Sequence, residues 1–490
     1  LSATRVNEAQ LIEKGRENIL LYSNDFSQSI WGKNSNSSIG SQTATDPFGV
    51  ANNAWLVTYD GTSNGRIEQQ ITQTGVKAMS LWVRTQSGTQ SIQVGFRGSS
   101  LSTYTATTTW QRFEHYDDHS TAFYPRLRCD SATTLEMFGF QVEQGLVATG
   151  YIETEASTVQ AGLLENTPRL DYSGGATCPS LLLEPSRANL IEQSEYFGDA
   201  SWTKQAGTTV SSNSIISPSG EMNGAEVTIG TNSNASLRAN NLVVINTENT
   251  FSVYAKKGVG STSLKLDVGD EGITTFTLTD QWQRFEVIGT PTIANREFVD
   301  IALNGNQGDT FYIWGAQVEQ QSYATSYIPT QGATSTRLQD IANNSGNATL
   351  INSEEGVLYA EISALADDGT NRFIIINDST NNNRLTFRYR ASNSMSMEVH
   401  IGGVLKVSMG FNSDITLTQK IALKYKESDF AFWVNGVEVG TSTLAEIWSA
   451  NTLNNIDFDG FGQPFFGKNK ALAVYKTALT DAELAELTTI

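Results

Sequence analysis

The chain has 490 residues, of which 39% are hydrophobic and only 17% are charged, so it is long enough for about three domains that each bury a core. The 32 Lys and Arg against 51 Asp and Glu give a net charge of −19, which excludes a nucleic-acid-binding protein that neutralises phosphates. No apolar run reaches the ~20 residues of a membrane span, so we expect a soluble protein without membrane insertion.

Two stretches of the chain repeat each other. Residues 18–26 (NILLYSNDF) and the following Trp31-Gly-Lys33 return 171 residues later as residues 189–197 (NLIEQSEYF) and Trp202-Thr-Lys204. Further blocks recur in the same order, namely 80–84 with 252–256, 110–114 with 282–286, 139–143 with 315–319 and 148–152 with 324–328. This order predicts two copies of one domain, the first over residues 1–155 and the second over residues 188–333.

Each copy has the pattern of an antiparallel β-sandwich. Apolar residues alternate with polar ones between clusters of Ser, Gly, Asn and Thr, as in residues 92–96 (IQVGF) and 264–268 (LKLDV). The tryptophans that recur at equivalent points are expected to pack in the cores: Trp31, Trp110, Trp202 and Trp282.

Residues 156–187 join the two copies. Pro168, Gly174-Gly175 and Pro185 are turn residues, but Leu181-Leu-Leu183 is apolar, so we predict a connector docked on a domain. The two cysteines, Cys129 and Cys178, are too few for a disulfide framework, and we expect two buried thiols, with a bridge between them as the alternative.

Residues 334–490 do not match the repeat and predict a third, larger sandwich. Residues 395–401 and 404–409 flank Gly402-Gly403, and residues 430–434 and 437–439 flank Asn435-Gly436, so each pair predicts a hairpin. Thr480-Asp-Ala-Glu483 ahead of Leu484 and Leu487 is typical of a capped terminal helix. The fold class that we predict is all-β, with three sandwiches in tandem.

The repeated blocks resemble those of tailed-bacteriophage and prophage virion proteins. The similarity is carried by residues 252–258 (SVYAKKG), 282–285 (WQRF), 314–319 (WGAQVE) and 323–330 (YATSYIPT), and by the connector segments 166–175 (NTPRLDYSGG) and 178–190 (CPSLLLEPSRANL). The resemblance implies jelly-roll modules of the carbohydrate-binding kind. Residues 432–440 (FWVNGVEVG) and 478–484 (ALTDAEL) resemble laminin-G and concanavalin-A-like sandwiches. The first copy departs from the pattern with Phe138-Gly-Phe140 in place of Trp314-Gly-Ala316, so the copies need not share a ligand.

The sequence offers little for catalysis, and we expect no enzyme. Of the three histidines, His115 and His119 bracket Asp117 and Asp118 in what we interpret as an exposed loop rather than a metal site, and His400 stands alone. Ser63 has the spacing of a nucleophile elbow but follows Asp60-Gly61, which begins a turn. The last domain also lacks the Glu-x-Asp-x-x-Glu strand of concanavalin-like glycosidases.

Basic and aromatic side chains that share one face of a strand predict a binding surface. In the third domain, alternation turns Arg384, Arg388 and Arg390 outward from one strand, Lys420, Lys424 and Lys426 from another, and Trp433 from a third. Such a face fits an acidic sugar polymer. The alternative is a solvated face with Trp433 covered by the terminal helix.

A smaller version of the same pattern occurs in both copies. Burial of Leu81 and Val83 turns Trp82 and Arg84 outward, and the equivalent strand of the second copy turns Tyr254 and Lys256 outward. Arg97 also faces outward and would lie beside Arg84 if their strands pair. The alternative is that Trp82 and Tyr254 belong to the core.

No cofactor is required by these patterns, but a structural calcium ion is a hypothesis. Such ions bind oxygen ligands near the first and last strands of carbohydrate-binding jelly rolls, where Asp25, Glu143, Glu195 and Glu319 lie.

The resemblance and the binding pattern lead to one hypothesis. We expect a virion surface protein, a fibre, spike or capsid decoration, that adheres to host-surface polysaccharide, contacts other virion proteins and forms a homo-oligomer, by resemblance a trimer. The alternatives are a purely structural decoration or connector protein and a polysaccharide depolymerase with a cleft in the last domain.

Overall fold

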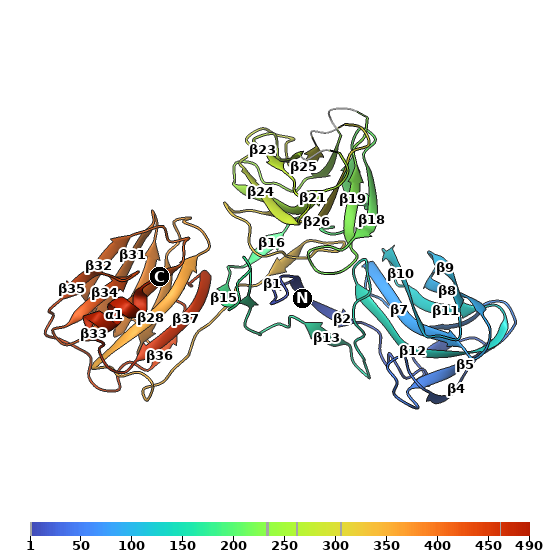
Figure 1. The fold of residues 1–490 in the computed structure, drawn as a ribbon, viewed down its shortest axis with the longest axis horizontal. Coiled ribbons are helices and arrows are strands. Elements are labelled where there is room, and N and C mark those ends of the chain that lie inside the picture. Colours follow the sequence, from blue (N-terminus) through green and yellow to red (C-terminus); the bar gives the residue numbers. More distant parts are fainter. Residues whose placement is uncertain (1, 232–234, 261–262, 304–305, 461) are drawn as a thin grey trace. The chain divides into compact units, whose positions relative to one another are not determined.

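The computed structural model describes residues 2–231, 235–260, 263–303, 306–460 and 462–490, and it divides the chain into two compact units. Unit 1 comprises residues 1–4, 11–167 and 188–336, and unit 2 comprises residues 5–10, 168–187 and 337–490. Strands make up both units, and α1 (Asp481–Thr488) is the only helix among the described residues (Figure 1). The all-β prediction is confirmed.

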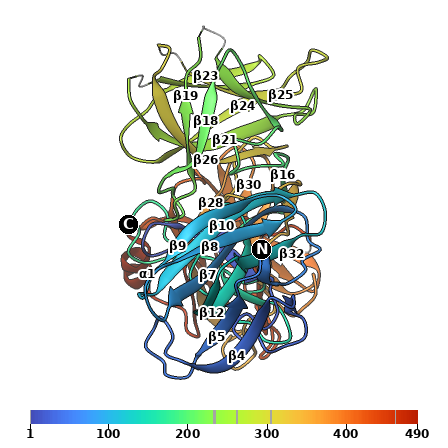
Figure 2. The same cartoon turned by 90° about the vertical axis from the view of Figure 1, so that its right-hand side faces the viewer.

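The two copies in unit 1 are β-sandwiches with the same strand order. In the first copy, one sheet has the order β10 (Gln111–His119), β7 (Gly75–Thr85), β12 (Ala132–Gln144), β5 (Ala54–Asp60), β4 (Ser37–Ala44). The other has the order β3 (Gly32–Lys33), β6 (Gly65–Glu68), β11 (Tyr124–Cys129), β8 (Gln90–Arg97), β9 (Leu101–Ala106). Figure 2 labels β10, β7, β12, β5 and β4 of the first of these sheets and β8 and β9 of the other.

In the second copy, the corresponding first sheet has the order β24 (Gln283–Gly289), β21 (Asn249–Lys257), β26 (Thr310–Glu319), β19 (Gly224–Thr228), β18 (Thr209–Ile215). The other sheet has the order β17 (Trp202–Lys204), β20 (Ser236–Asn240), β25 (Phe298–Leu303), β22 (Ser263–Val268), β23 (Gly272–Thr277). All neighbours are antiparallel. The core lies between the two sheets of each copy, and the predicted core residues Trp31 and Trp202 are each 1% exposed within it.

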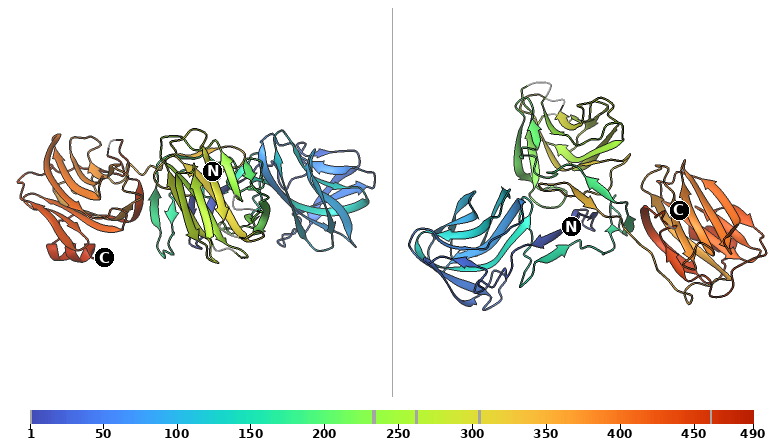
Figure 3. Two further views of the ribbon diagram at one scale, coloured as in Figure 1. Left: turned by 90° about the horizontal axis from the view of Figure 1, so that it is seen from above. Right: turned by 180° about the vertical axis from the view of Figure 1, so that it is seen from behind.

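Unit 2 is a larger sandwich. Its seven-stranded sheet has the order β14 (Leu170–Asp171), β15 (Ser180–Leu183), β37 (Gly467–Tyr475), β28 (Glu355–Ala364), β33 (Gln419–Lys426), β34 (Phe430–Val434), β35 (Val437–Ser442). The facing sheet has the order β32 (Val404–Asn412), β31 (Ser394–Ile401), β30 (Arg384–Arg390), β29 (Arg372–Asn377), β36 (Asn455–Asp457). Helix α1 packs on the outer face of the seven-stranded sheet (Figure 3).

Both predicted hairpins form in unit 2. Strands β31 and β32 pair across Gly402-Gly403, and β34 and β35 pair across Asn435-Gly436. Asn435 and Gly436 both have positive φ, at 50° and 82°, which is the backbone that a two-residue hairpin turn of this hand requires.

The predicted connector contributes to both units. In unit 1, β13 (Val159–Gly162) pairs with β2 (Ile12–Asn18). In unit 2, β14 and β15 extend the seven-stranded sheet beside β37, so the Leu-rich run is docked as the strand between β14 and β37. The short strands β1 (Thr4–Val6), β16 (Arg187–Asn189) and β27 (Ser335–Arg337) lie where the chain passes from one unit to the other.

Candidate functional site

The strongest candidate site is the outer face of β7 in the first copy. Leu81 and Val83 are fully buried in the core, and Trp82 and Arg84 alternate with them and remain partly exposed on the opposite face. The predicted orientation is therefore confirmed, and the alternative that Trp82 is a core residue is wrong.

Two cross-strand rows surround these side chains. In the first row, Trp82 faces Arg112 on β10 and Phe138 on β12, and the Arg112 guanidinium lies 4.6 Å from the Trp82 ring centroid. In the second row, Arg84 stacks 4.8 Å from the centroid of Trp110 and pairs with Glu136 at 2.6 Å. We call the side chains of these two rows the first grid.

A loop places Phe48 beside the first grid. The carboxylate of Asp46 accepts hydrogen bonds from the backbone N–H groups of Phe48 (2.8 Å) and Val50 (2.9 Å), and from Asn53 (2.8 Å). Although burial opposes it, these bonds lower the pKa of Asp46, so the loop is held by a charged cap. The Phe48 ring contacts Trp82 and Phe138 at centroid distances of 5.6 and 5.8 Å and remains 65% exposed.

A bulge in β12 makes room for the aromatic rings. The register shifts between Phe138 and Gln141, so that Phe138 faces the first grid and Phe140 faces the core. Gly139 has φ +61°, and a Cβ there would lie 3.2 Å from the rings of both Trp82 and Tyr151. Only glycine adopts this backbone without strain while leaving the rings in contact.

The bases of the first grid are paired. Glu136 neutralises Arg84, and Arg112 lies 3.5 Å from Glu114 while donating hydrogen bonds to Ser80 Oγ (2.8 Å) and the Thr149 carbonyl oxygen. Burial lowers the pKa of Arg112 and raises that of Glu114. Aromatic faces beside balanced donors and acceptors suit a sugar ring with several hydroxyl groups, through stacking and charge-assisted hydrogen bonds.

The second copy carries the same rows in the same register. Tyr254 faces Arg284 and Trp314, and Lys256 faces Tyr312, as Trp82 faces Arg112 and Phe138 in the first copy. Arg284 likewise donates to Ser252 Oγ (2.9 Å) and the Thr325 carbonyl (2.6 Å), and Lys256 lies 5.7 Å from the Trp282 centroid. We call these side chains the second grid.

The second grid is covered by another segment of unit 1. Ile12 of β2 forms a buried cluster with Trp314 and Tyr327, and Tyr254 and Trp282 pack against that cluster. Trp314 and Tyr327 are at most 1% exposed. The predicted residues Tyr254 and Lys256 thus face outward from their own sandwich but lie beside a covered surface.

The arginine row of the third domain also has the predicted orientation. Leu385, Phe387 and Tyr389 are fully buried, whereas Arg384, Arg388 and Arg390 lie on the outer face of β30. Arg388 and Arg390 share the carboxylate of Glu398, at 3.4 and 2.6 Å, and Arg384 contacts His400 Nε2 at 3.0 Å. Burial, and then the charge of Arg384, lowers the pKa of His400. Two guanidinium groups that share one carboxylate, with Arg384 on the same face, leave donors that can bind a further anionic group.

The lysine row and Trp433 do not form an exposed platform, and that prediction is wrong. Trp433 is 7% exposed beneath Leu484 of α1, as the alternative interpretation expected. Lys424 is 5% exposed and pairs with Asp429 at 2.7 Å and, more distantly, with Asp481 at the start of the helix. Helix α1 therefore removes this face of β33 and β34 from the candidate site.

The two remaining lysines of that row are partnered at its ends. Lys426 pairs with Glu355 at 3.2 Å, and Lys420 donates to the carbonyl oxygen of Thr489 at 2.8 Å.

Arg97 does not lie beside Arg84. Strand β8 belongs to the other sheet of the first copy, where it pairs with β11 and β9, so the proposed pairing with β7 is wrong. Arg97 instead contacts Glu68 at 3.2 Å and the ring of Tyr124 at 4.9 Å.

The sequence did not single out Trp110 and Arg112 of the first grid, or Phe48 beside it, as binding residues. Trp110 was expected in the core, as was Trp282, but both are partly exposed on the outer faces of their copies. Arg112 alternates with the buried Phe113 inside a repeated block, and that alternation would have identified it. Phe48 follows Asp46-Pro47, a turn signal whose side-chain direction only the structure shows.

The carboxylates proposed for calcium accept hydrogen bonds from protein groups. Glu143 accepts from Thr149 N and Oγ1 and from Gln141, and Glu319 accepts from the equivalent Thr325 and Gln317. Asp25 accepts from Ser27 and Gln28, and Glu195 from Lys14, Asn223 and Tyr327. Within the described ranges, no three His, Cys, Asp or Glu side chains gather as metal ligands, and calcium stays a prediction.

The histidines of the first copy and one of the cysteines differ from what the sequence predicts. His115 and His119 lie in β10 rather than in a loop, with His119 stacked on Phe123 at 3.9 Å and His115 bonded to Ser100 and Ser102. The cysteines are free, but only Cys129 is buried, and Cys178 is exposed.

Comparison with known proteins finds a family model that matches the third domain. Residues 347–485 match the Laminin_G_3 model, described as the concanavalin A-like lectin/glucanases superfamily. No curated protein matches the chain. In the part of the chain that the structure describes, no helix is both long and apolar enough to span a bilayer.

Solved structures with similar folds cover parts of the chain. They include the CBM40 domain of the Ruminococcus gnavus IT-sialidase bound to α2,3-sialyllactose (17% identity, 30% of this chain and 95% of that chain, TM-score 0.27). The CBM22-1–CBM22-2 tandem of Paenibacillus barcinonensis Xyn10C is 11% identical, and the match covers 62% of this chain and 98% of that chain, with a TM-score of 0.25. The family match and the two facing sheets of unit 2 give residues 347–485 a concanavalin A-like fold, within a chain built from β-sandwiches.

Proposed function

We propose that the protein is a non-enzymatic glycan-binding protein and that the first grid is its principal site. The observation that carries this proposal is the juxtaposition of Phe48, Trp82 and Trp110 with the paired bases Arg84 and Arg112 on one partly exposed sheet face. A rigid aromatic surface beside oriented donors and acceptors is what recognition of a sugar ring requires.

The match of the third domain to a family described by lectins and glucanases supports binding of the same ligand class. There, the arginine row on β30 is the proposed contact for a carboxylate or sulfate group of an acidic glycan. Charged hydrogen bonds from Arg388 and Arg390 would compete with those to Glu398.

We further propose that the protein is displayed on a bacteriophage particle, where it contacts other virion proteins and host polysaccharide. The resemblance of the repeated blocks to phage and prophage virion proteins supports this location. One shallow stacking site binds weakly, whereas several linked sites raise avidity by about 10²–10⁴, so a homotrimeric assembly fits the proposed role.

The test of glycan binding uses the fluorescently labelled full chain and host cells, with neutral and acidic polysaccharides as competitors. Trp82→Ala and Arg84→Ala should each weaken binding on the order of tenfold, because each loses a stacking face or a charged donor. Arg97→Ala is the matched control, since Arg97 is also paired with a glutamate but lies on the other sheet. Equal effects of Arg84→Ala and Arg97→Ala would contradict the site.

The proposed location is tested on purified phage particles. Gold-labelled antibodies against the chain should decorate the particle surface in electron micrographs, and their absence from particles that carry the gene would contradict a virion role. Release of reducing or unsaturated ends from a bound polysaccharide would instead favour the depolymerase alternative.

A further inference from the structure

We infer that the second grid is not a glycan site but the receptor for the N-terminal strand of its own chain, so that the jelly rolls offer one glycan site between them. The inference rests on the proposed function for its glycan-binding consequence. Its structural part stands on contacts within unit 1 alone.

The apolar contact is central to this inference. Ile12 is 6% exposed and packs with Trp314 and Tyr327, and its backbone N–H donates to the carbonyl oxygen of Pro218 at 2.9 Å. A sugar ring stacks only on an aromatic face that is open to it. Because Trp314 and Tyr327 are at most 1% exposed, that part of the second grid has no face to offer.

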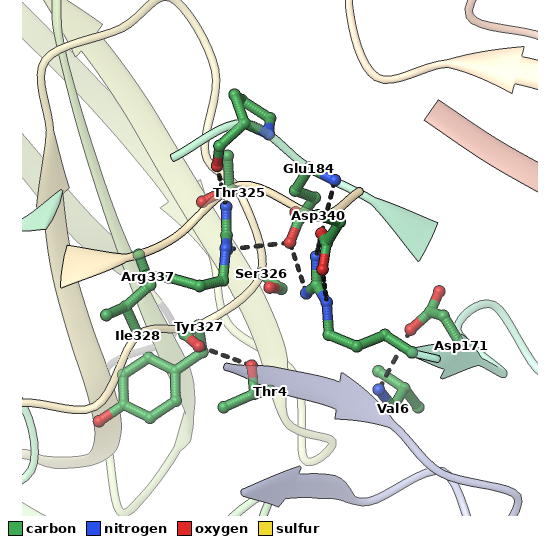
Figure 4. Close-up of polar contacts among 12 residues, drawn as sticks. Thr4, Val6, Asp171, Glu184, Thr325, Ser326, Tyr327, Ile328, Arg337 and Asp340 are labelled. Carbon is green, nitrogen blue, oxygen red and sulfur yellow. Dashed lines mark hydrogen bonds and ion pairs between the residues drawn. The ribbon is translucent and has the colours of Figure 1, made fainter. Parts of the chain in front are cut away.

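Polar contacts flank Ile12 along the chain, one from Thr4 in β1 and one from Lys14 in β2. Thr4 Oγ1 donates to the Tyr327 carbonyl oxygen at 2.6 Å, a bond drawn in Figure 4. Lys14 Nζ lies 2.7 Å from Glu195, whose carboxylate is 2% exposed and also accepts from Asn223 (2.8 Å) and the Tyr327 hydroxyl (3.0 Å). The buried carboxylate is thus satisfied in part by the strand that covers the grid.

The two copies differ at the position that decides whether the strand fits. At the 171-residue offset, Phe48 and Gly49 of the first copy correspond to Ser219 and Gly220 of the second. A Cβ at Gly220 would lie 2.9 Å from Leu11 Cδ1, so the small residues of this loop leave the room that Leu11 and Ile12 occupy. In the first copy, the Phe48 ring itself packs on Phe138.

The strand belongs to a repeated docking element. Leu11-Ile12-Glu13, Arg16 and Asn18 recur 171 residues later as Leu182-Leu183-Glu184, Arg187 and Asn189. In unit 2, Leu183 lies in the core of the third domain. Leu11-Ile12 and Leu182-Leu183 therefore each dock on the domain after the one that they precede, and the first copy receives no such strand among the described residues.

The first experiment compares glycan binding by full-length variants in the host-cell assay. Tyr254→Ala and Lys256→Ala should stay within about twofold of the unmodified chain, whereas Trp82→Ala, the matched change in the first copy, loses about tenfold. A loss with Tyr254→Ala as large as that with Trp82→Ala would overturn the inference.

The second experiment tests the strand without a glycan. Ser219→Phe, which installs the first copy's residue in the second, should displace Leu11 and Ile12, and the Ile12 amide should exchange with deuterium at least tenfold faster. Ser211→Phe, on an edge strand of the same copy, is the control. Unchanged exchange in a folded Ser219→Phe chain would overturn the inference. If the unmodified chain binds no glycan, the proposed function fails and the exchange result alone decides the strand's role.

Discussion

Asn18 and Asn189 close their domains with the same hydrogen bonds. Asn18 donates to the Ile152 carbonyl (2.8 Å) and accepts from the backbone N–H groups of Leu20 and Val142, and Asn189 makes the equivalent bonds to Ile328, Ile191 and Val318. These asparagines are fully buried. The residues that make the repeat visible are therefore largely those that satisfy buried backbone groups, and a ligand is not needed to explain their recurrence.

A buried carboxyl pair in the second copy makes stability depend on pH. Asp267 on β22 faces Asp300 on β25, and the two are 3% and 7% exposed. Burial, and then the charge of Asp300, raises the pKa of Asp267 to about 6, while Asp300 pairs with Arg238 at 2.8 Å. The folded state holds the proton of Asp267 more tightly than the unfolded chain does. The contribution of this group to the free energy of unfolding is therefore fully present below about pH 4 and is lost as the pH rises through about 6.

Asp267→Asn should therefore raise the free energy of unfolding by about 2 kcal/mol at pH 8 and leave it nearly unchanged at pH 4. The amide keeps an oxygen for the backbone N–H of Asp270, which now donates to Asp267 at 2.8 Å. Urea unfolding at both pH values measures the difference. A gain of the same size at pH 4 and pH 8 would show that the carboxyl does not titrate as argued.

At the scale of the element, α1 covers the outer face of β33 and β34 and so removes it from solvent. The helix begins with a capping box, in which Thr480 accepts from the Glu483 N–H and Glu483 accepts from the Thr480 N–H at 2.7 Å. Its two fully buried residues are Leu484 and Thr488, and the apolar one, Leu484, packs on Trp433 with Val357, Ala422 and Ala431. An eight-residue helix is marginal alone, so this contact anchors it.

Leu484→Ala should lower the free energy of unfolding by about 2–4 kcal/mol, because it leaves a cavity above Trp433. Thr480→Ala should cost about 1 kcal/mol through loss of the cap. Urea unfolding followed by tryptophan fluorescence measures both changes. Glu486→Ala on the exposed side of the helix is the control, and a cost for it equal to that of Leu484→Ala would contradict the packing argument.

At the scale of the whole molecule, unit 2 gathers sequence-distant segments around buried charges. Arg169 and Arg337 both pair with Glu184, at 2.7 and 2.9 Å, and Asp340 accepts from Arg169 Nε (3.1 Å) and from the Glu184 N–H (2.7 Å). Figure 4 shows Arg337 and Glu184 joined by a dashed line. The cluster ties residues 168–187 of the connector to the start of the third domain.

Glu184→Gln should destabilise unit 2 by about 3–5 kcal/mol, because two buried guanidinium groups lose their shared carboxylate. Scanning calorimetry should show that the transition of unit 2 falls in temperature while that of unit 1 stays, since the cluster lies in unit 2. Glu354→Gln on the exposed surface should shift neither transition. A parallel shift of both transitions with Glu184→Gln would mean that the units unfold as one.

The sequence by itself determined the sandwich fold, the two copies, both hairpins and the outward direction of Trp82, Arg84 and the β30 arginines. These follow from local rules, because alternation assigns a side chain to one face of a strand and turn residues end that strand. Tertiary structure alone decided which outward face stays open. Ile12 covers the second grid and α1 covers Trp433. The segment that covers a sheet face comes from a distant part of the chain. The alternation within a strand sets the face on which a side chain lies, but it does not predict what packs on that face.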